Sequence, residues 1–102
     1  MDRGSLQLSL FQNDNLLGQS VAISGRLSIP RREAIDLVLY SHGTYRSTVS
    51  SLTTMLVVGK IRSTAPDGLT KKIRAANLLN AADPGRIQII GQGEFYRLLD
   101  SG

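Results

Sequence analysis

Residues 49–59 read Val-Ser-Ser-Leu-Thr-Thr-Met-Leu-Val-Val-Gly, and this stretch decides the class of fold. Its second part, Met55 to Val58, is wholly apolar and lies between a hydroxyl-rich turn and Gly59. A short, wholly apolar run is typical of a β-strand that is buried on both faces. Such strands belong to parallel sheets whose two faces are covered by helices. The stretch therefore predicts an α/β domain built on a parallel sheet.

Upstream of this stretch, the sequence predicts a strand, a helix and a second strand. Apolar residues alternate with smaller ones over residues 20–24, as in a strand. Ser28 is the expected N-cap of the helix that follows, with Pro30 in its first turn. We expect Gly43 to end this helix by adopting a positive φ, before the β-prone run 44–48.

Downstream, the sequence predicts a helix, a strand and a closing helix. Thr70 is the expected N-cap of a helix that runs to about Asn80. Residues 86–90 have the composition of a strand, and residues 93–99 that of a short helix. The order β-α-β-β-α-β-α predicts four parallel strands flanked by helices on both faces, because parallel strands need crossover connections.

The composition indicates one soluble domain that prefers anionic partners. The 102 residues suffice for one hydrophobic core, with residues 1–14 as a flexible polar leader and residues 15–100 as the domain. Cysteine is absent and no apolar run could span a membrane, so we expect a cytoplasmic protein. The net charge is +4. Half of the twelve basic residues fall in two windows around predicted helix starts: Arg26, Arg31, Arg32, Lys71, Lys72 and Arg74.

The sequence offers little from which to build a catalytic site. His42 is the single histidine, and its place at a helix end suits a contact with the helix dipole better than catalysis. The carboxylates are scattered along the chain and form no metal-binding pattern. Residues 58–60 lack the rest of a P-loop, and residues 91–93 lack the rest of a dinucleotide-binding fingerprint. We therefore expect no enzymatic activity, no cofactor, no metal and no small-molecule substrate.

Two separate segments could together form an oxyanion site. Ser24 and Gly25 follow the first strand, where open parallel sheets commonly bind ligands. Thr70, Lys71 and Lys72 open the second helix, whose free N–H groups and dipole attract anions. The alternative is that the serine closes a strand, the threonine caps a helix and the lysines solubilise the surface.

The chain resembles the BRCT domain over about residues 14–100. The matching segments are Leu17-Gly18-Gln19, Ile23 to Leu27, Arg32-Glu33-Ala34, His42-Gly43, residues 49–59 and Lys71 to Ala76, together with Phe95 in the place of a frequent tryptophan. Among BRCT domains it looks most like the single-copy type of bacterial NAD-dependent DNA ligases and of the replication factor C large subunit. The resemblance implies a sheet in the order 2-1-3-4, with the first and third helices on one face and the second on the other.

The resemblance also implies a non-catalytic module that binds phosphate. Its implied ligands are Ser24, Gly25 and Lys71, to which the residue pattern adds Thr70. Arg31, Lys72 and Arg74 are expected to contact the DNA backbone, Arg31 and Arg74 by similarity to the replication factor C type. The expected partner is a DNA end with a 5′ phosphate or a phosphorylated protein, in DNA replication or repair.

The alternative is a protein-protein adaptor whose phosphate pocket is vestigial. BRCT domains that read phosphopeptides usually work in tandem, whereas this chain has one copy, so sequence-selective phosphopeptide reading is not expected from the resemblance. His42 in place of a glycine changes only a turn, and Phe95 keeps an aromatic anchor.

Overall fold

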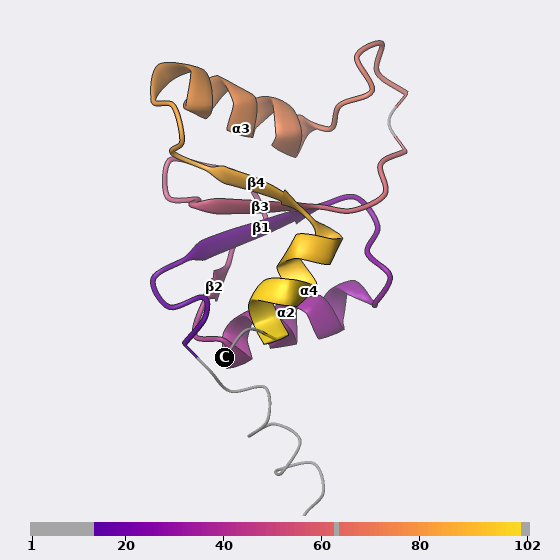
Figure 1. Ribbon diagram of the computed structural model, residues 1–102. Helices are drawn as coiled ribbons and strands as arrows, with labels where there is room; N and C mark the ends of the chain where they lie inside the picture. Colours follow the sequence, from indigo (N-terminus) through magenta and orange to yellow (C-terminus); the bar gives the residue numbers. More distant parts are fainter. Residues whose placement is uncertain (1–13, 63, 101–102) are drawn as a thin grey trace, which may run out of the picture.

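The structure is a computed structural model that describes residues 14–62 and 64–100 (Figure 1). The predicted leader, apart from Asp14, lies outside the described residues. Four parallel strands form one sheet in the order β2-β1-β3-β4, as predicted. The elements are β1 (Ser20–Ser24), α2 (Arg31–Tyr40), β2 (Thr44–Tyr45), β3 (Met55–Val58), α3 (Lys71–Ala82), β4 (Gln88–Gly91) and α4 (Gln92–Asp100).

The apolar run at the centre of the sheet behaves as its composition predicts. Met55, Leu56 and Val57 of β3 are buried, and the strand lies between β1 and β4. Val21 of β1 pairs with Met55, which in turn pairs with Gln88 of β4. A strand in this place has no solvent-facing side, so each of its residues favours an apolar side chain.

Helices cover the two faces of the sheet as expected, with α2 and α4 on one face and α3 on the other (Figure 1). The core on the α2 and α4 face includes Ala34, Val38 and Phe95, each without exposed surface. The core beneath α3 includes Ile73 and Ala76. No helix in the described ranges is long and apolar enough to cross a membrane.

The start of α2 differs from the prediction. Ser28 is not its N-cap, because the helix begins at Arg31 after Pro30 and its first turn has no side-chain cap. The Ser28 hydroxyl instead forms a hydrogen bond of 2.8 Å with the Tyr96 hydroxyl of α4. The serine therefore connects the β1–α2 loop to the last helix.

The end of α2 also differs from the prediction. His42, not Gly43, adopts the positive φ, at 63°. An added Cβ at Gly43 would lie 3.0 Å from the Leu16 Cβ, so close packing explains the glycine. His42 Nδ1 lies 3.0 Å from an Asp14 carboxylate oxygen, which gives the imidazole a partner outside the helix.

Candidate anion-binding site

The carboxyl ends of β1 and β3 lie side by side and are tied together by their backbones. The Gly59 N–H donates to the Ser24 carbonyl over 2.8 Å. Arg26 and Lys60 exchange two backbone hydrogen bonds of 2.8 Å each, as an antiparallel bridge beyond the strands. The basic side chains of the two loops are therefore brought to one edge of the sheet.

This close approach requires two glycines. An added Cβ at Gly59 would lie 2.4 Å from the Arg26 carbonyl oxygen, which no side chain tolerates. Gly25 has a φ of +83°, and an added Cβ there would lie 2.8 Å from the Lys60 carbonyl oxygen. Gly25 therefore has a structural role whether or not its N–H binds a ligand.

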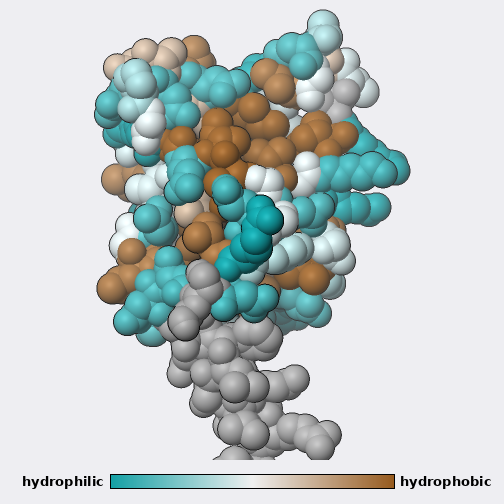
Figure 2. Space-filling view, in the orientation of Figure 1, coloured by the Kyte–Doolittle hydropathy of each residue, from teal (hydrophilic) through white to brown (hydrophobic). Residues whose placement is uncertain are grey.

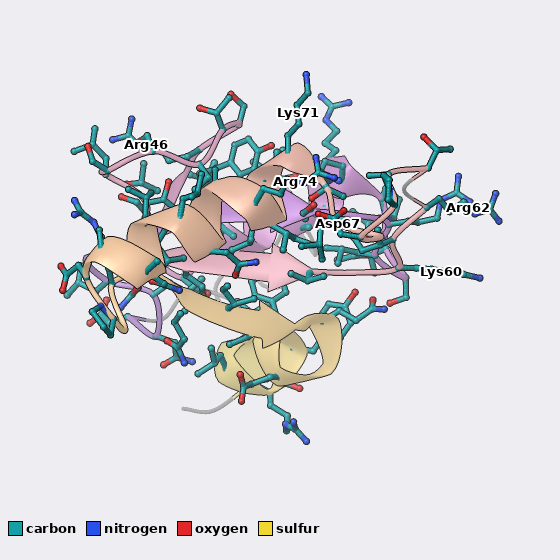
Figure 3. All side chains as sticks on the ribbon, turned by 90° about the horizontal axis from the view of Figure 1, so that it is seen from above. Arg46, Lys60, Arg62, Asp67, Lys71 and Arg74 are labelled. Atoms are coloured by element: carbon teal, nitrogen blue, oxygen red, sulfur yellow. The ribbon has the colours of Figure 1, made fainter. Side chains whose placement is uncertain are left out.

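A pocket of about 480 Å³ opens at this edge, and its lining contains four cationic side chains. Among the described residues, no carboxylate lines it. Figure 3 shows Lys60 and Arg62 extending from this end of the protein. The lining consists of Gly25, Arg26, Arg31, Lys60, Arg62 and Thr70. Unopposed positive charge of this kind attracts an anion.

Two hydroxyl groups meet at the start of α3, as the sequence predicted. The Ser24 Oγ and the Thr70 Oγ1 lie 2.6 Å apart, and Ser24 is 3% exposed. Thr70 caps α3 as expected, because its Oγ1 accepts a hydrogen bond of 3.3 Å from the Ile73 N–H. Of this pair, Thr70 lines the pocket and Ser24 lies behind it.

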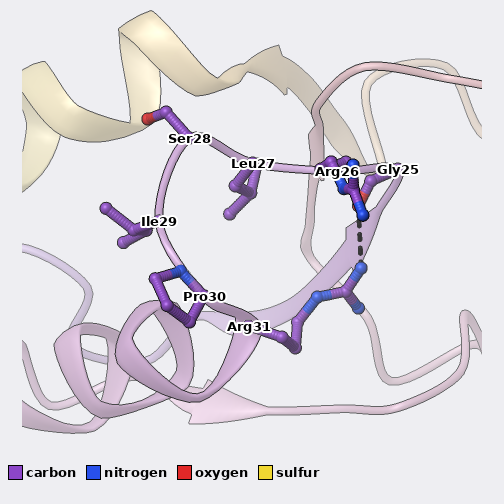
Figure 4. A pocket seen from close by; sticks show the side chains of 7 residues that line it. All are labelled: Gly25, Arg26, Leu27, Ser28, Ile29, Pro30 and Arg31. Atoms are coloured by element: carbon purple, nitrogen blue, oxygen red, sulfur yellow. Dashed lines mark hydrogen bonds between the residues drawn. The ribbon is translucent and has the colours of Figure 1, made fainter.

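Two cations converge on the carbonyl oxygen of Ile23, next to Ser24. Lys72 Nζ lies 2.6 Å from this oxygen, and one Arg31 nitrogen lies 3.3 Å from it. A second Arg31 nitrogen donates to the Gly25 carbonyl over 2.8 Å (Figure 4). Burial lowers the pKa of the Lys72 ammonium, and the neighbouring charge of Arg31 lowers it further. The two side chains are held together although their charges repel.

Lys71, the predicted phosphate ligand, does not join this group. Its side chain is exposed and projects away from the body of the protein (Figure 3). Lys72 reaches the end of β1 instead. Residues four apart share a helix face, so Lys72 lies on the same side of α3 as Ala76, which is buried against the sheet.

Arg74, which is predicted to contact the DNA backbone, has a partner within the protein. Its guanidinium forms an ion pair with the Asp67 carboxylate at 2.7 Å, in the loop before α3. Hydrogen bonding from Arg74 lowers the pKa of Asp67 to about 2. A guanidinium whose charge is matched in this way is a weak candidate for a DNA backbone contact.

Arg26, Lys60 and Arg62 line the pocket although the sequence did not predict them as site residues. Arg26 stands directly after Gly25, and the other two follow the glycine that ends β3. Parallel neighbouring strands end at the same edge, so basic residues after β3 had to lie near those after β1. Once β1 and β3 were expected to be neighbours, their order could therefore have predicted that these basic residues lie together.

Comparison with known proteins shows that the chain has the fold of BRCT domains. It superposes on the C-terminal BRCT domain of human XRCC1 with a TM-score of 0.60 and 13% identity, covering 83% of this chain and 78% of that one. The second XRCC1 BRCT domain gives 0.60 and 13%, with 84% and 77% covered. No family model matches the sequence, and no curated protein is significantly similar to it. The closer resemblance to DNA ligase and replication factor C domains stays a prediction.

Proposed function

We propose that this domain is a non-catalytic docking module that binds a phosphate group, on the 5′ end of DNA or on a phosphorylated protein, for replication or repair machinery. The observation that carries the proposal is the pocket with four cations at the carboxyl end of β1. It opens beside Thr70 at the start of α3, where free N–H groups and the helix dipole also favour an anion.

The hydroxyl pair supplies a donor for the phosphate. If Ser24 donates to Thr70, the two lone pairs of the Thr70 oxygen are filled by Ser24 and by the Ile73 N–H. The Thr70 proton is then available to a ligand in the pocket, which Gly25 also lines. In this arrangement Thr70 and Gly25 contact the phosphate, and Ser24 positions Thr70.

Lys72 and Arg31 supply the neutralising charge. Both cations lie within hydrogen-bonding distance of one carbonyl oxygen, which cannot neutralise them. A phosphate dianion next to them would reduce their mutual repulsion and form charge-assisted hydrogen bonds, which are stronger than those to a carbonyl. Arg26, Lys60 and Arg62 on the rim would attract further charge on the ligand.

The second candidate is a protein-protein adaptor, which large exposed apolar side chains favour. Leu17, Leu52 and Leu78 are 65%, 59% and 73% exposed; the first two lie in turns and the third on α3. Isolated exposed leucines are common on protein surfaces, so they support an interface less strongly than the pocket supports a phosphate.

The test is a fluorescence anisotropy titration with a labelled DNA duplex that carries a 5′ phosphate, and with the same duplex ending in a 5′ hydroxyl. A phosphorylated and an unphosphorylated peptide form the second pair of probes. We expect the phosphorylated member of at least one pair to bind more tightly, with an affinity that falls steeply as the salt concentration rises. Equal binding within both pairs, with little salt dependence, would favour the adaptor.

A further inference from the structure

A groove of about 240 Å³ lies between α2 and α4, on the face of the sheet opposite α3 (Figure 1). We call it the α2–α4 groove, and its lining consists of Ser28, Ile29, Leu37, Tyr96, Leu99 and Asp100. Figure 2 shows apolar side chains at the surface over the part of the molecule where α2 and α4 lie, among hydrophilic neighbours. Most small-molecule sites have volumes of roughly 300–1,000 Å³, so this smaller groove is better suited to a few side chains of a polypeptide.

The described chain begins between the carboxyl ends of the same two helices. The Asn15 amide donates to the carbonyls of Leu98 and Leu99 in α4, over 2.7 Å and 3.4 Å. The Leu16 N–H donates over 3.0 Å to the carbonyl of Ser41, the residue that follows α2. The residues that precede Asp14 are therefore joined to the domain at one end of the α2–α4 groove, next to Leu99.

The sequence just before this point contains a short apolar pattern. Leu6, Leu8 and Leu10 alternate with polar residues, although they belong to the segment expected to be a polar leader. Alternation with a period of two places apolar side chains on one side of an extended segment. These residues lie outside the described ranges, so their pattern is known from the sequence alone.

The length of this segment matches the length of the groove. The nine residues of α4 give a helix about 13 Å long. An extended chain advances about 3.3–3.6 Å per residue, so four extended residues cover this length. Leu8 stands six positions before Asp14, which corresponds to a reach of about 20 Å, and Leu10 stands four positions before it. Both leucines can therefore reach the groove from the point where the chain enters the domain.

We propose that the α2–α4 groove binds residues 8–11 of this same chain in an extended conformation, with the side chains of Leu8 and Leu10 against its apolar lining. The segment and the groove complement each other in chemistry, length and point of attachment. The contact does not depend on the proposed phosphate binding. A docked segment covers the groove, so a partner protein that used this surface would first have to displace it.

The first test is an NMR measurement on the full chain with isotope-labelled leucine methyl groups. We expect nuclear Overhauser contacts between the methyl groups of the segment and those of Leu37 and Leu99. Leu78 should show none with the segment, because it lies on α3, across the sheet, and is 73% exposed. A mixture of two differently labelled samples distinguishes contacts within one copy from contacts between copies.

The second test is urea unfolding of two variants and their combination. Leu8→Ser with Leu10→Ser alters the segment, and Leu37→Ser alters the groove. We expect each to raise the unfolding equilibrium constant roughly tenfold, from lost apolar burial offset by the freedom that the segment regains. Because both remove the same contact, the combined variant should show a change much smaller than the product of the two.

Leu39→Ser is the matched control, because Leu39 is on the same helix, is 51% exposed and does not line the groove. Its effect should multiply with that of the segment variant. Segment contacts within one copy, together with the smaller combined change for Leu37→Ser, would support the proposal. Absent contacts, contacts only between separate copies, or effects that multiply for Leu37→Ser as well would each overturn it.

Discussion

At the scale of single residues, the choice between Lys71 and Lys72 determines how phosphate would be neutralised. The two lysines are adjacent in sequence, yet only Lys72 is directed to the end of β1, where its Nζ lies 2.6 Å from the Ile23 carbonyl oxygen. Lys71 projects into solvent (Figure 3). An exposed lysine contributes about 0–1 kcal/mol to an ionic contact, whereas a charge-assisted hydrogen bond contributes about 1.5–3 kcal/mol.

Lys72→Ala is therefore expected to weaken binding of a phosphorylated ligand by about ten- to a hundredfold. Lys71→Ala should weaken it much less, mainly by reducing the dependence on salt. This order reverses the one that the sequence suggested. Anisotropy titrations of both variants at two salt concentrations measure the difference, and equal losses would indicate diffuse attraction in place of a specific pocket.

The same lysine predicts a pH dependence for the proposed phosphate binding. Its pKa lies below the ordinary value of 10.5, so its charge is lost at a lower pH than that of an exposed lysine. Affinity for phosphate should fall as the pH rises through the lowered pKa of Lys72. The Lys72→Ala variant should lack this component, which titrations from neutral to alkaline pH would detect.

Gly59→Ala tests the contact between the two loops that form the pocket. The new Cβ would lie 2.4 Å from the Arg26 carbonyl oxygen, so the backbones must separate. We expect a loss of about 1–3 kcal/mol in the free energy of unfolding, together with weaker phosphate binding. Urea unfolding measures the first effect.

Gly93→Ala is the control for this substitution, because a Cβ at that position in α4 meets nothing within 4 Å. It should be neutral or stabilise the protein by up to about 1 kcal/mol, since alanine favours a helix more than glycine does. A Gly59→Ala variant as stable as the wild type would contradict the proposed close approach of the loops.

At the scale of elements, the loop before α3 is held to the helix by the ion pair of Asp67 with Arg74. The Asp67 carboxylate also accepts a hydrogen bond of 3.0 Å from the Leu69 N–H, just before the Thr70 cap. These contacts fix the direction in which the chain enters α3. They therefore help to place Thr70 beside Ser24, on which the proposed donor depends.

Arg74→Gln should raise the pKa of Asp67 from about 2 toward its ordinary value of 3.8, because Arg74 is the main cause of the shift. The folded-state pKa lies below the unfolded one, so the pair stabilises the fold above about pH 4, and this contribution is lost as the pH falls through about 2. An NMR titration of the Asp67 carboxyl carbon measures the change. Lys71→Gln should leave that pKa in place, and a value still near 2 in Arg74→Gln would refute the assignment.

At the scale of the whole molecule, Phe95 joins the last helix to the sheet. Its side chain has no exposed surface and packs in the core that also contains Val21, Val38 and Met55. The segment before β1 is tied to α4 as well, since the Asn15 amide donates to the Leu98 carbonyl over 2.7 Å. The two ends of the described chain thus contribute to one core.

Phe95→Ala is expected to reduce the free energy of unfolding by about 3–5 kcal/mol, from lost apolar burial and the cavity that remains. Leu78→Ala is the matched control, because Leu78 is 73% exposed and should change stability by no more than about 0.5 kcal/mol. Urea unfolding of both variants measures the effect, and a small change for Phe95→Ala would mean that α4 packs more loosely than the structure shows.

The sequence by itself determined the class of fold and the order of its elements. The apolar run Met55–Val58, the alternation in β1 and the Thr70 cap are local patterns, and the backbone responds to each over a few residues. Ser24 and Thr70 could likewise be predicted as neighbours, because each ends or begins an element at the same edge of a parallel sheet.

Only the tertiary structure decided which side chains meet at the carboxyl end of β1. Lys72, and not Lys71, reaches the Ile23 carbonyl oxygen because the rotation of α3 about its axis is set by packing on the sheet, and one residue changes a side chain's direction by about 100°. Ser28 does not cap α2, and its hydroxyl instead forms a hydrogen bond with the Tyr96 hydroxyl, which is distant in the sequence. The order of the strands implies that Arg26, Lys60 and Arg62 lie near one another, but their placement around one pocket depends on the close approach of the two loops at Gly25 and Gly59.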